Sequence, residues 1–275
     1  MVQRALPIAV GVRGGPSTHC GHPVADYRPR MSDAEAKLHD AIEGLYVAFA
    51  AIPRRDNLEA SPVHDGDDFF GRLTSAPLRD LTEQDLALYS SSAITTVGDD
   101  RDYRHFLPRI LELSVGSMWI GAEPEVTASR LNMASWREWP EKQKVAILRF
   151  FRSAFAASLE QHPNCRRNAA VWFCGLTILG DSPSLTLERW RSSTSTNTAL
   201  NLAAFIIDEA KHVRRQGEVR GPFWEDVDVQ VRRDVAERLM STTTREFLEA
   251  AMGSASEEDR FYLLDAALAE LQRLD

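Results

Sequence analysis

The sequence predicts an all-α fold of about ten helices. Apolar residues recur at spacings of three and four along most of the chain, which is the period of an amphipathic helix. Several of these segments begin directly after a serine or threonine that has an acidic residue three positions further along the chain. This pattern is typical of a helix N-terminus. No stretch alternates apolar and polar residues between hairpin turns, so we expect no sheet.

The first two helices have the clearest boundaries. One is expected at about 32–52, where Ser32 can form a capping box with Glu35. The next is expected from Thr82 to about Val97, with a glycine directly after it as a stop signal.

A proline interrupts the third helical pattern, which extends from Asp99 to Val115. Pro108 lacks a backbone donor and disfavours helical geometry at the residue before it. We therefore expect a kink at this point, or a short helix followed by a second one that starts at Pro108.

The second half of the chain continues the same spacing. Helices are expected at about 124–134, 139–160, 166–179, 185–191, 197–215, 224–240, 242–252 and from Ser256 onward. The segment 166–179 is apolar all round, which is typical of a buried central helix. Buried stripes are expected to include Phe151 and Phe155 in one helix, and Phe261, Leu264, Leu268 and Leu271 in the last. Helices of this length favour antiparallel hairpins, packed as a compact multi-helix domain or as an irregular α-solenoid-like array.

Composition excludes several classes of protein. The 275 residues include 32 Lys and Arg against 40 Asp and Glu, which gives a net charge of −8. This negative charge disfavours a nucleic-acid partner, because nucleic acids are themselves negatively charged. No apolar run approaches the roughly 20 residues of a membrane span, so we expect no membrane association. Three cysteines are too few for a disulfide framework, and we find no secretion signal, so a cytoplasmic location is expected.

Residues 1–30 differ from the rest of the chain. They contain four arginines, one aspartate and four prolines, and they have no helical periodicity. This composition predicts a disordered basic leader, followed by a single all-helical domain at 31–275. The alternative is that Met31 is the native start.

The segment from Pro77 to Leu113 contains two motifs, A-x-T-T-x-G at 93–98 and D-Y-x-H-F-L-P-R-I-L-E-L at 102–113. It resembles a family of uncharacterised bacterial helical proteins that share these motifs in this order. The resemblance covers less than a third of the chain. It implies a helical bacterial protein, and it supplies no established activity.

Candidate binding residues fall within these motifs. Asp102, His105 and Arg109 are spaced i, i+3 and i+7, so on a continuous helix they share one face. There an arginine could bind an anion while the aspartate orients the imidazole. Thr95 and Thr96 could line a ligand site with their hydroxyl groups. The alternative for all five residues is structural hydrogen bonding, including capping of a helix end.

No residue is assigned a catalytic role. The sequence has no G-x-S-x-G nucleophile motif and no glycine-rich nucleotide loop, so we expect no cofactor. His19, Cys20 and His22 lack a fourth ligand nearby, and we expect no metal site. The predicted function is a cytoplasmic, non-catalytic protein-interaction or scaffold module whose partner is another protein. The alternative is a small-molecule enzyme or ligand-binding protein that uses Asp102, His105 and Arg109.

Overall fold

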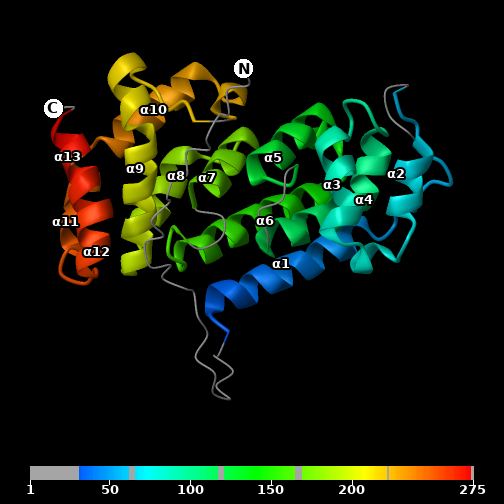
Figure 1. Ribbon diagram of the computed structural model, residues 1–275, viewed down its shortest axis with the longest axis horizontal. Helices are drawn as coiled ribbons and strands as arrows, with labels where there is room; N and C mark the ends of the chain where they lie inside the picture. Colours follow the sequence, from blue (N-terminus) through cyan, green and yellow to red (C-terminus); the bar gives the residue numbers. More distant parts are fainter. Residues whose placement is uncertain (1–30, 62–65, 117–120, 165–168, 222, 274–275) are drawn as a thin grey trace, which may run out of the picture. The chain divides into compact units, whose positions relative to one another are not determined.

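The computed structural model describes residues 31–61, 66–116, 121–164, 169–221 and 223–273 (Figure 1). Within these ranges the chain is helical and forms no β-strand. Two isolated β-bridges join Ala60 and Ala93 to Val97. The predicted all-α fold is therefore confirmed. The expected leader at 1–30 lies outside the described residues.

The helical elements follow one another with short connections. In chain order they are α1 (Asp33–Phe49), α2 (Gly66–Leu73), η1 (Leu78–Asp80), α3 (Glu83–Ser92), α4 (Asp100–Gly116), α5 (Pro124–Met133), η2 (Trp136–Glu138), α6 (Glu141–Leu159), α7 (Ala169–Ile178), α8 (Pro183–Arg191), α9 (Thr196–Gln216), η3 (Trp224–Asp226), α10 (Val229–Leu239), α11 (Thr242–Ala251), α12 (Glu257–Asp259), η4 (Arg260–Asp265) and α13 (Ala266–Gln272). The elements η1 to η3 are 3-10 helices, and η4 is a π-helical turn.

Local capping interactions fix the helix starts that the sequence predicted. Ser32 Oγ accepts from the backbone N–H of Glu35 at 3.1 Å, and Glu35 Oε2 accepts from the N–H of Ser32 at 3.0 Å. Thr82 and Asp85 make the same reciprocal pair at the start of α3. Each capping box satisfies two backbone donors that the first helical turn leaves without partners.

Helix α3 is shorter than predicted. It ends at Ser92, five residues before Val97, because Ile94 adopts a left-handed φ of 67° that no α-helix can contain. The chain beyond it joins an extended segment instead. The N–H of Gly98 donates to the carbonyl of Glu59 at 2.7 Å, and the N–H of Ser61 donates to the carbonyl of Thr96.

Helix α4 is a single element, and the expectation of a second helix starting at Pro108 is wrong. The proline lies inside α4 and is buried. The helix packs against α1, α3 and α5, and these tertiary contacts compensate for the one backbone hydrogen bond that the proline removes.

Two further boundaries differ from the prediction. The segment expected as one helix at 224–240 is divided into η3 and α10, and Asp228 caps α10 by accepting from the N–H of Gln230. Near the C-terminus, the chain enters the π-helical turn η4 after Ser256 caps α12. A π-helical turn contains more residues than an α-helical turn, so its side chains point to other faces than the spacing of an α-helix predicts. Phe261 is consequently exposed, although the spacing placed it on the buried stripe.

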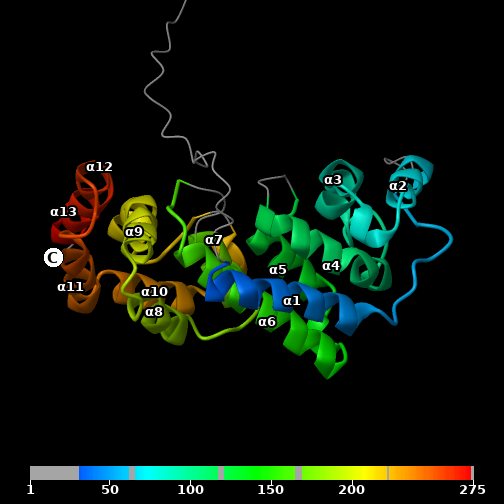
Figure 2. The same cartoon turned by 90° about the horizontal axis from the view of Figure 1, so that it is seen from below.

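Helices that are far apart in the sequence lie side by side. Helix α1 runs along α6, α5 packs against α7, and α13 packs against α9 (Figure 2). In an α-solenoid, each repeat contacts only the repeats next to it in the sequence. The pairs α1–α6 and α9–α13 therefore support the compact multi-helix alternative.

An aromatic cluster forms the centre of the core between α6 and η3. Phe151 packs edge-on against Trp172, and Phe155 packs against Trp190. Both phenylalanines are buried, as the sequence predicted. The cluster continues through the stacked rings of Phe205 on α9 to Trp224 on η3. Phe173 of α7 packs edge-on against both Phe205 and Trp224, which fixes α9 and η3 relative to α7.

Across the described residues, no helix combines the length and the apolar character that crossing a membrane requires.

Candidate functional site

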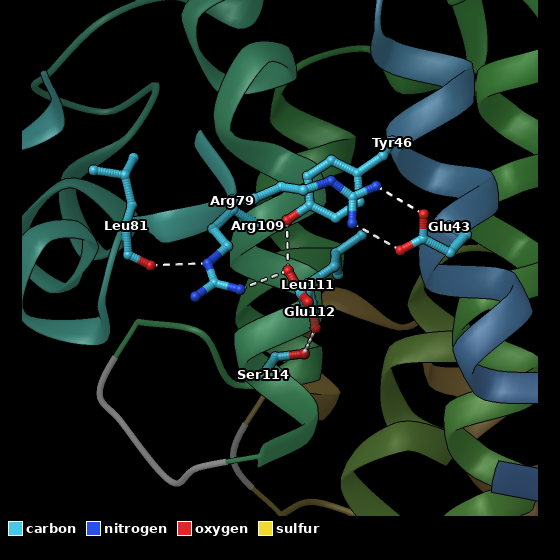
Figure 3. A network of polar contacts seen from close by, with 8 residues as sticks. All are labelled: Glu43, Tyr46, Arg79, Leu81, Arg109, Leu111, Glu112 and Ser114. Carbon is cyan, nitrogen blue, oxygen red and sulfur yellow. Dashed lines mark hydrogen bonds and ion pairs between the residues drawn. The ribbon is translucent and has the colours of Figure 1, made fainter. Parts of the chain in front are cut away.

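Arg109 is engaged in a network of polar side chains between α1, η1 and α4 (Figure 3). Its Nε donates to the carbonyl of Leu81 at 2.8 Å, and its Nη1 donates to Glu112 Oε2 at 2.7 Å. The hydroxyl of Tyr46 donates to the same Glu112 oxygen. Burial and this carboxylate raise the pKa of Tyr46. The guanidinium of Arg79 lies 3.7 Å above the Tyr46 ring. Arg109 therefore joins α4 to Leu81, and Glu112, which Arg109 contacts, joins α4 to Tyr46 of α1.

His105 faces a different backbone segment. Its Nδ1 lies 2.8 Å from the carbonyl oxygen of Ile52. Because a carbonyl can only accept, Nδ1 carries the proton when this bond is formed. Burial lowers the pKa of His105, and the positive charge of Arg54 lowers it further. The imidazole is therefore held in its neutral form at pH 7.

Asp102 caps the start of its own helix. Its Oδ2 accepts from the backbone N–H of Asp99 at 3.2 Å and lies 3.4 Å from Nη1 of Arg55. Burial raises the pKa of Asp102, and the neighbouring charge of Asp99 contributes in the same direction. No hydrogen bond joins any two of Asp102, His105 and Arg109 in the described structure, because each contacts a different neighbour.

The two threonines lie at the C-terminal end of α3. Thr95 Oγ1 donates to the carbonyl of Ser92 at 2.8 Å, and Thr96 Oγ1 approaches the same oxygen at 3.4 Å. Hydroxyl groups commonly satisfy helix-terminal carbonyls in this way. The geometry thus supports the structural alternative for all five predicted residues, and their role in binding stays a prediction.

A cavity of about 280 Å³ lies elsewhere, among α5, α7, α9 and η3. Its lining contains both polar and apolar residues, and comprises Glu125, Ala170, Val171, Cys174, Phe205, Asp208, Glu209, His212, Gly221 and Trp224. The four α9 residues are spaced i, i+3, i+4 and i+7, so they form one face of that helix. We refer to this feature as the α9 cavity.

Close packing of α5 against α7 places two of the lining residues together. A Cβ on Gly175 would lie 2.9 Å from Cε1 of Phe151 and 3.2 Å from the carbonyl oxygen of Pro124. Only glycine allows this approach without displacement of the neighbours. The first turn of α5, which contains Glu125, is therefore next to Cys174, the residue before this glycine.

Backbone hydrogen bonds hold the carboxylate of Glu209 in place. The N–H groups of Arg220 and Gly221 donate to its two oxygens at 2.7 and 2.9 Å. The side chain is only 3% exposed. Burial raises the pKa of Glu209, while the two backbone donors and His212 lower it.

Electrostatics in the α9 cavity disfavour a reactive thiol. Burial raises the pKa of Cys174 well above its ordinary value, and the charges of Glu125 and Glu209 add to this effect. The protonated thiol is a poor nucleophile. Burial also raises the pKa of Asp208. In the described part of the chain, no three His, Cys, Asp or Glu side chains are arranged to hold a metal ion.

One sequence signal could have pointed to this cavity. Glu209 and His212 form a Glu-x-x-His motif, whose i, i+3 spacing places both side chains on one helix face. Neither residue is among the candidate binding residues predicted from the sequence. Glu125 and Trp224 are too distant in the sequence to be associated with the motif before the fold is known.

Comparison with known proteins found no matching family model, no matching curated protein and no matching solved structure.

Proposed function

We propose that this protein is a non-catalytic, cytoplasmic interaction module that binds a protein partner through an exposed aromatic pair. The observation that carries the proposal is the exposure of Phe261 and Tyr262, each of which is 65% accessible to solvent. Their rings pack edge to face with centroids 5.0 Å apart. Large aromatic side chains contribute disproportionately to protein interfaces.

The helix around this aromatic pair is unusual in a way that supports a binding role. Both residues belong to the π-helical turn η4, which packs against α9 and α13. Leu264 anchors the turn in the core. π-turns are rare and frequently occur at functional sites. A regular helix would have placed Phe261 on the buried stripe, so the π-turn presents a side chain that the sequence pattern assigns to the core.

The charges beside the aromatic pair indicate the chemistry of the partner. Between Ser256 and Asp265, four acidic residues stand against one arginine. Asp259 is paired with His162 at 2.9 Å, while Glu257 and Glu258 are exposed. An aromatic patch with an acidic rim is complementary to a partner surface that has an apolar centre and basic edges.

The test compares proteins captured by three forms of the full chain from a cell lysate. The variant Phe261→Ser/Tyr262→Ser removes the pair, and Val47→Ser/Leu88→Ser removes two exposed apolar residues elsewhere. We expect the wild type and the control to retain the same partner with basic surface residues and the first variant to lose it. Because exposed substitutions change stability by about 0.5 kcal/mol or less, all three should have similar Tm values. Identical capture by all three forms would contradict the proposal.

A further inference from the structure

We propose that the α9 cavity binds a small organic cation, an ammonium or guanidinium group attached to an apolar body. The inference does not depend on the aromatic pair of η4, because the α9 cavity is formed by different residues. It rests on the shape of the cavity, the charges that line it and the rings that form its wall.

The aromatic residues give the cavity an apolar wall. Phe205 and Trp224 are nearly parallel, at 17°, with centroids 6.2 Å apart, and both line the cavity. Because Phe205 also stacks on Trp190, these rings are fixed in the core and provide apolar surface for the body of the ligand. Val171 and Ala170 add apolar surface for the body of the ligand. At about 280 Å³ the cavity is at the lower end of ligand pockets, which indicates a small metabolite.

The polar lining is dominated by carboxylates. Glu125, Asp208 and Glu209 contribute three acidic groups, and no lysine or arginine is among the described lining residues. Among the lining residues that the structure describes, only His212 can acquire a positive charge. The two backbone donors on Glu209 fix its carboxylate before any ligand arrives. Such preorganisation reduces the entropic cost of binding.

Cys174 provides an independent sign that the cavity accommodates a ligand. Its side chain is 3% exposed and lines the cavity, and its thiol has no hydrogen-bond partner in the part of the chain that the structure describes. A buried sulfur without a partner at a cavity wall is a weak acceptor, to which an ammonium or guanidinium N–H can donate. The thiol also serves as a reporter, because occupancy of the cavity restricts access to it.

The test measures alkylation of Cys174 in the full chain by iodoacetamide at pH 9 over many hours, because the raised pKa of the buried thiol makes the reaction slow. Peptide mass spectrometry resolves the products, so that Cys20 and Cys165 are read separately. The probes are butylammonium and butylguanidinium, with neutral 1-pentanol and anionic pentanoate as matched controls. We expect the two cations to slow alkylation at least threefold in a saturable manner, and the controls to leave it unchanged. Equal protection by 1-pentanol, or no protection by any probe, would overturn the proposal.

Variants connect the effect to the carboxylates. Glu125→Gln should weaken cation protection about tenfold, and Asp208→Asn, which removes a second carboxylate from the lining, should weaken it at least threefold. Glu246→Gln on α11 is the matched control and should bind as the wild type does. Retained protection in both cavity variants would overturn the proposal.

A separate arm of the experiment tests the metal ions Zn²⁺ and Mn²⁺ as probes. Protection by either ion that EDTA reverses, without protection by the organic cations, would identify a metal site and contradict the inference.

Discussion

The Oε1 atom of Glu209 accepts a hydrogen bond from the backbone N–H of Gly221 at 2.9 Å. This bond joins α9 to the turn that leads into η3, and thereby positions Trp224 against Phe205. It also places a charged side chain in the wall of the α9 cavity. One contact therefore serves both the packing of the core and the electrostatics of the candidate ligand site.

The close approach at this contact predicts that Gly221→Ala destabilises the protein. A Cβ at position 221 would lie 2.6 Å from Glu209 Oε1, so the carboxylate must move and weaken its backbone hydrogen bonds. We expect a loss of about 1–3 kcal/mol in the free energy of unfolding, measured by urea denaturation. The matched control is Gly44→Ala, inside α1 with no atom within 4 Å of the new Cβ. It should stabilise the protein by roughly 0.5–1 kcal/mol. Equal effects of the two substitutions would contradict this interpretation.

The aromatic core predicts a large effect for Phe151→Ala. The ring is fully buried and packs edge-on against Phe150 and Trp172. Its removal leaves a cavity that these large neighbours cannot fill, at a cost of roughly 3–5 kcal/mol in urea denaturation. Val47→Ala, at a position that is 74% exposed, should change stability by less than about 0.5 kcal/mol. A small effect at Phe151 would show that the core assignment is wrong.

Features that depend on neighbouring residues were predictable from the sequence. The capping boxes at Ser32 and Thr82 involve residues three positions apart, and both are formed. Features that depend on tertiary contacts were not. Pro108 is accommodated in α4 because surrounding helices support it, and Ile94 adopts a left-handed conformation where α3 meets the extended segment. Local propensity cannot indicate either outcome, since tertiary packing overrides it.

The candidate sites illustrate the same division. The spacing of Asp102, His105 and Arg109 correctly indicates one helix, but their partners, such as Ile52 and Leu81, come from other segments. The α9 cavity combines α5, α7, α9 and η3, and periodicity carries no information about which helices meet. Only the Glu-x-x-His motif at 209–212 was accessible from the sequence.

The environment of His105 predicts acid sensitivity. Burial lowers its pKa in the folded state, so the unfolded chain binds the proton more tightly. Stability from this residue is therefore fully present above the unfolded pKa of about 6.5 and is lost as pH falls through the folded pKa. His105→Asn removes the titration and keeps a donor for the carbonyl of Ile52. We expect urea melts between pH 7 and pH 5 to show a smaller loss of stability for the variant. Parallel profiles would indicate that His105 is not buried in solution.

The double substitution His105→Ala/Arg109→Ala separates the structural role of these residues from a role in binding. In the structure both side chains donate to backbone carbonyls, of Ile52 and Leu81 respectively. Removing the two donors leaves both carbonyls without these partners, which should lower the free energy of unfolding by roughly 2–5 kcal/mol in total. His39→Ala/Arg101→Ala removes the same two residue types from exposed positions and should have little effect. A double variant as stable as the wild type would contradict the structural role. It would then favour the binding role predicted for His105 and Arg109, because side chains that do not stabilise the fold are free to contact a ligand.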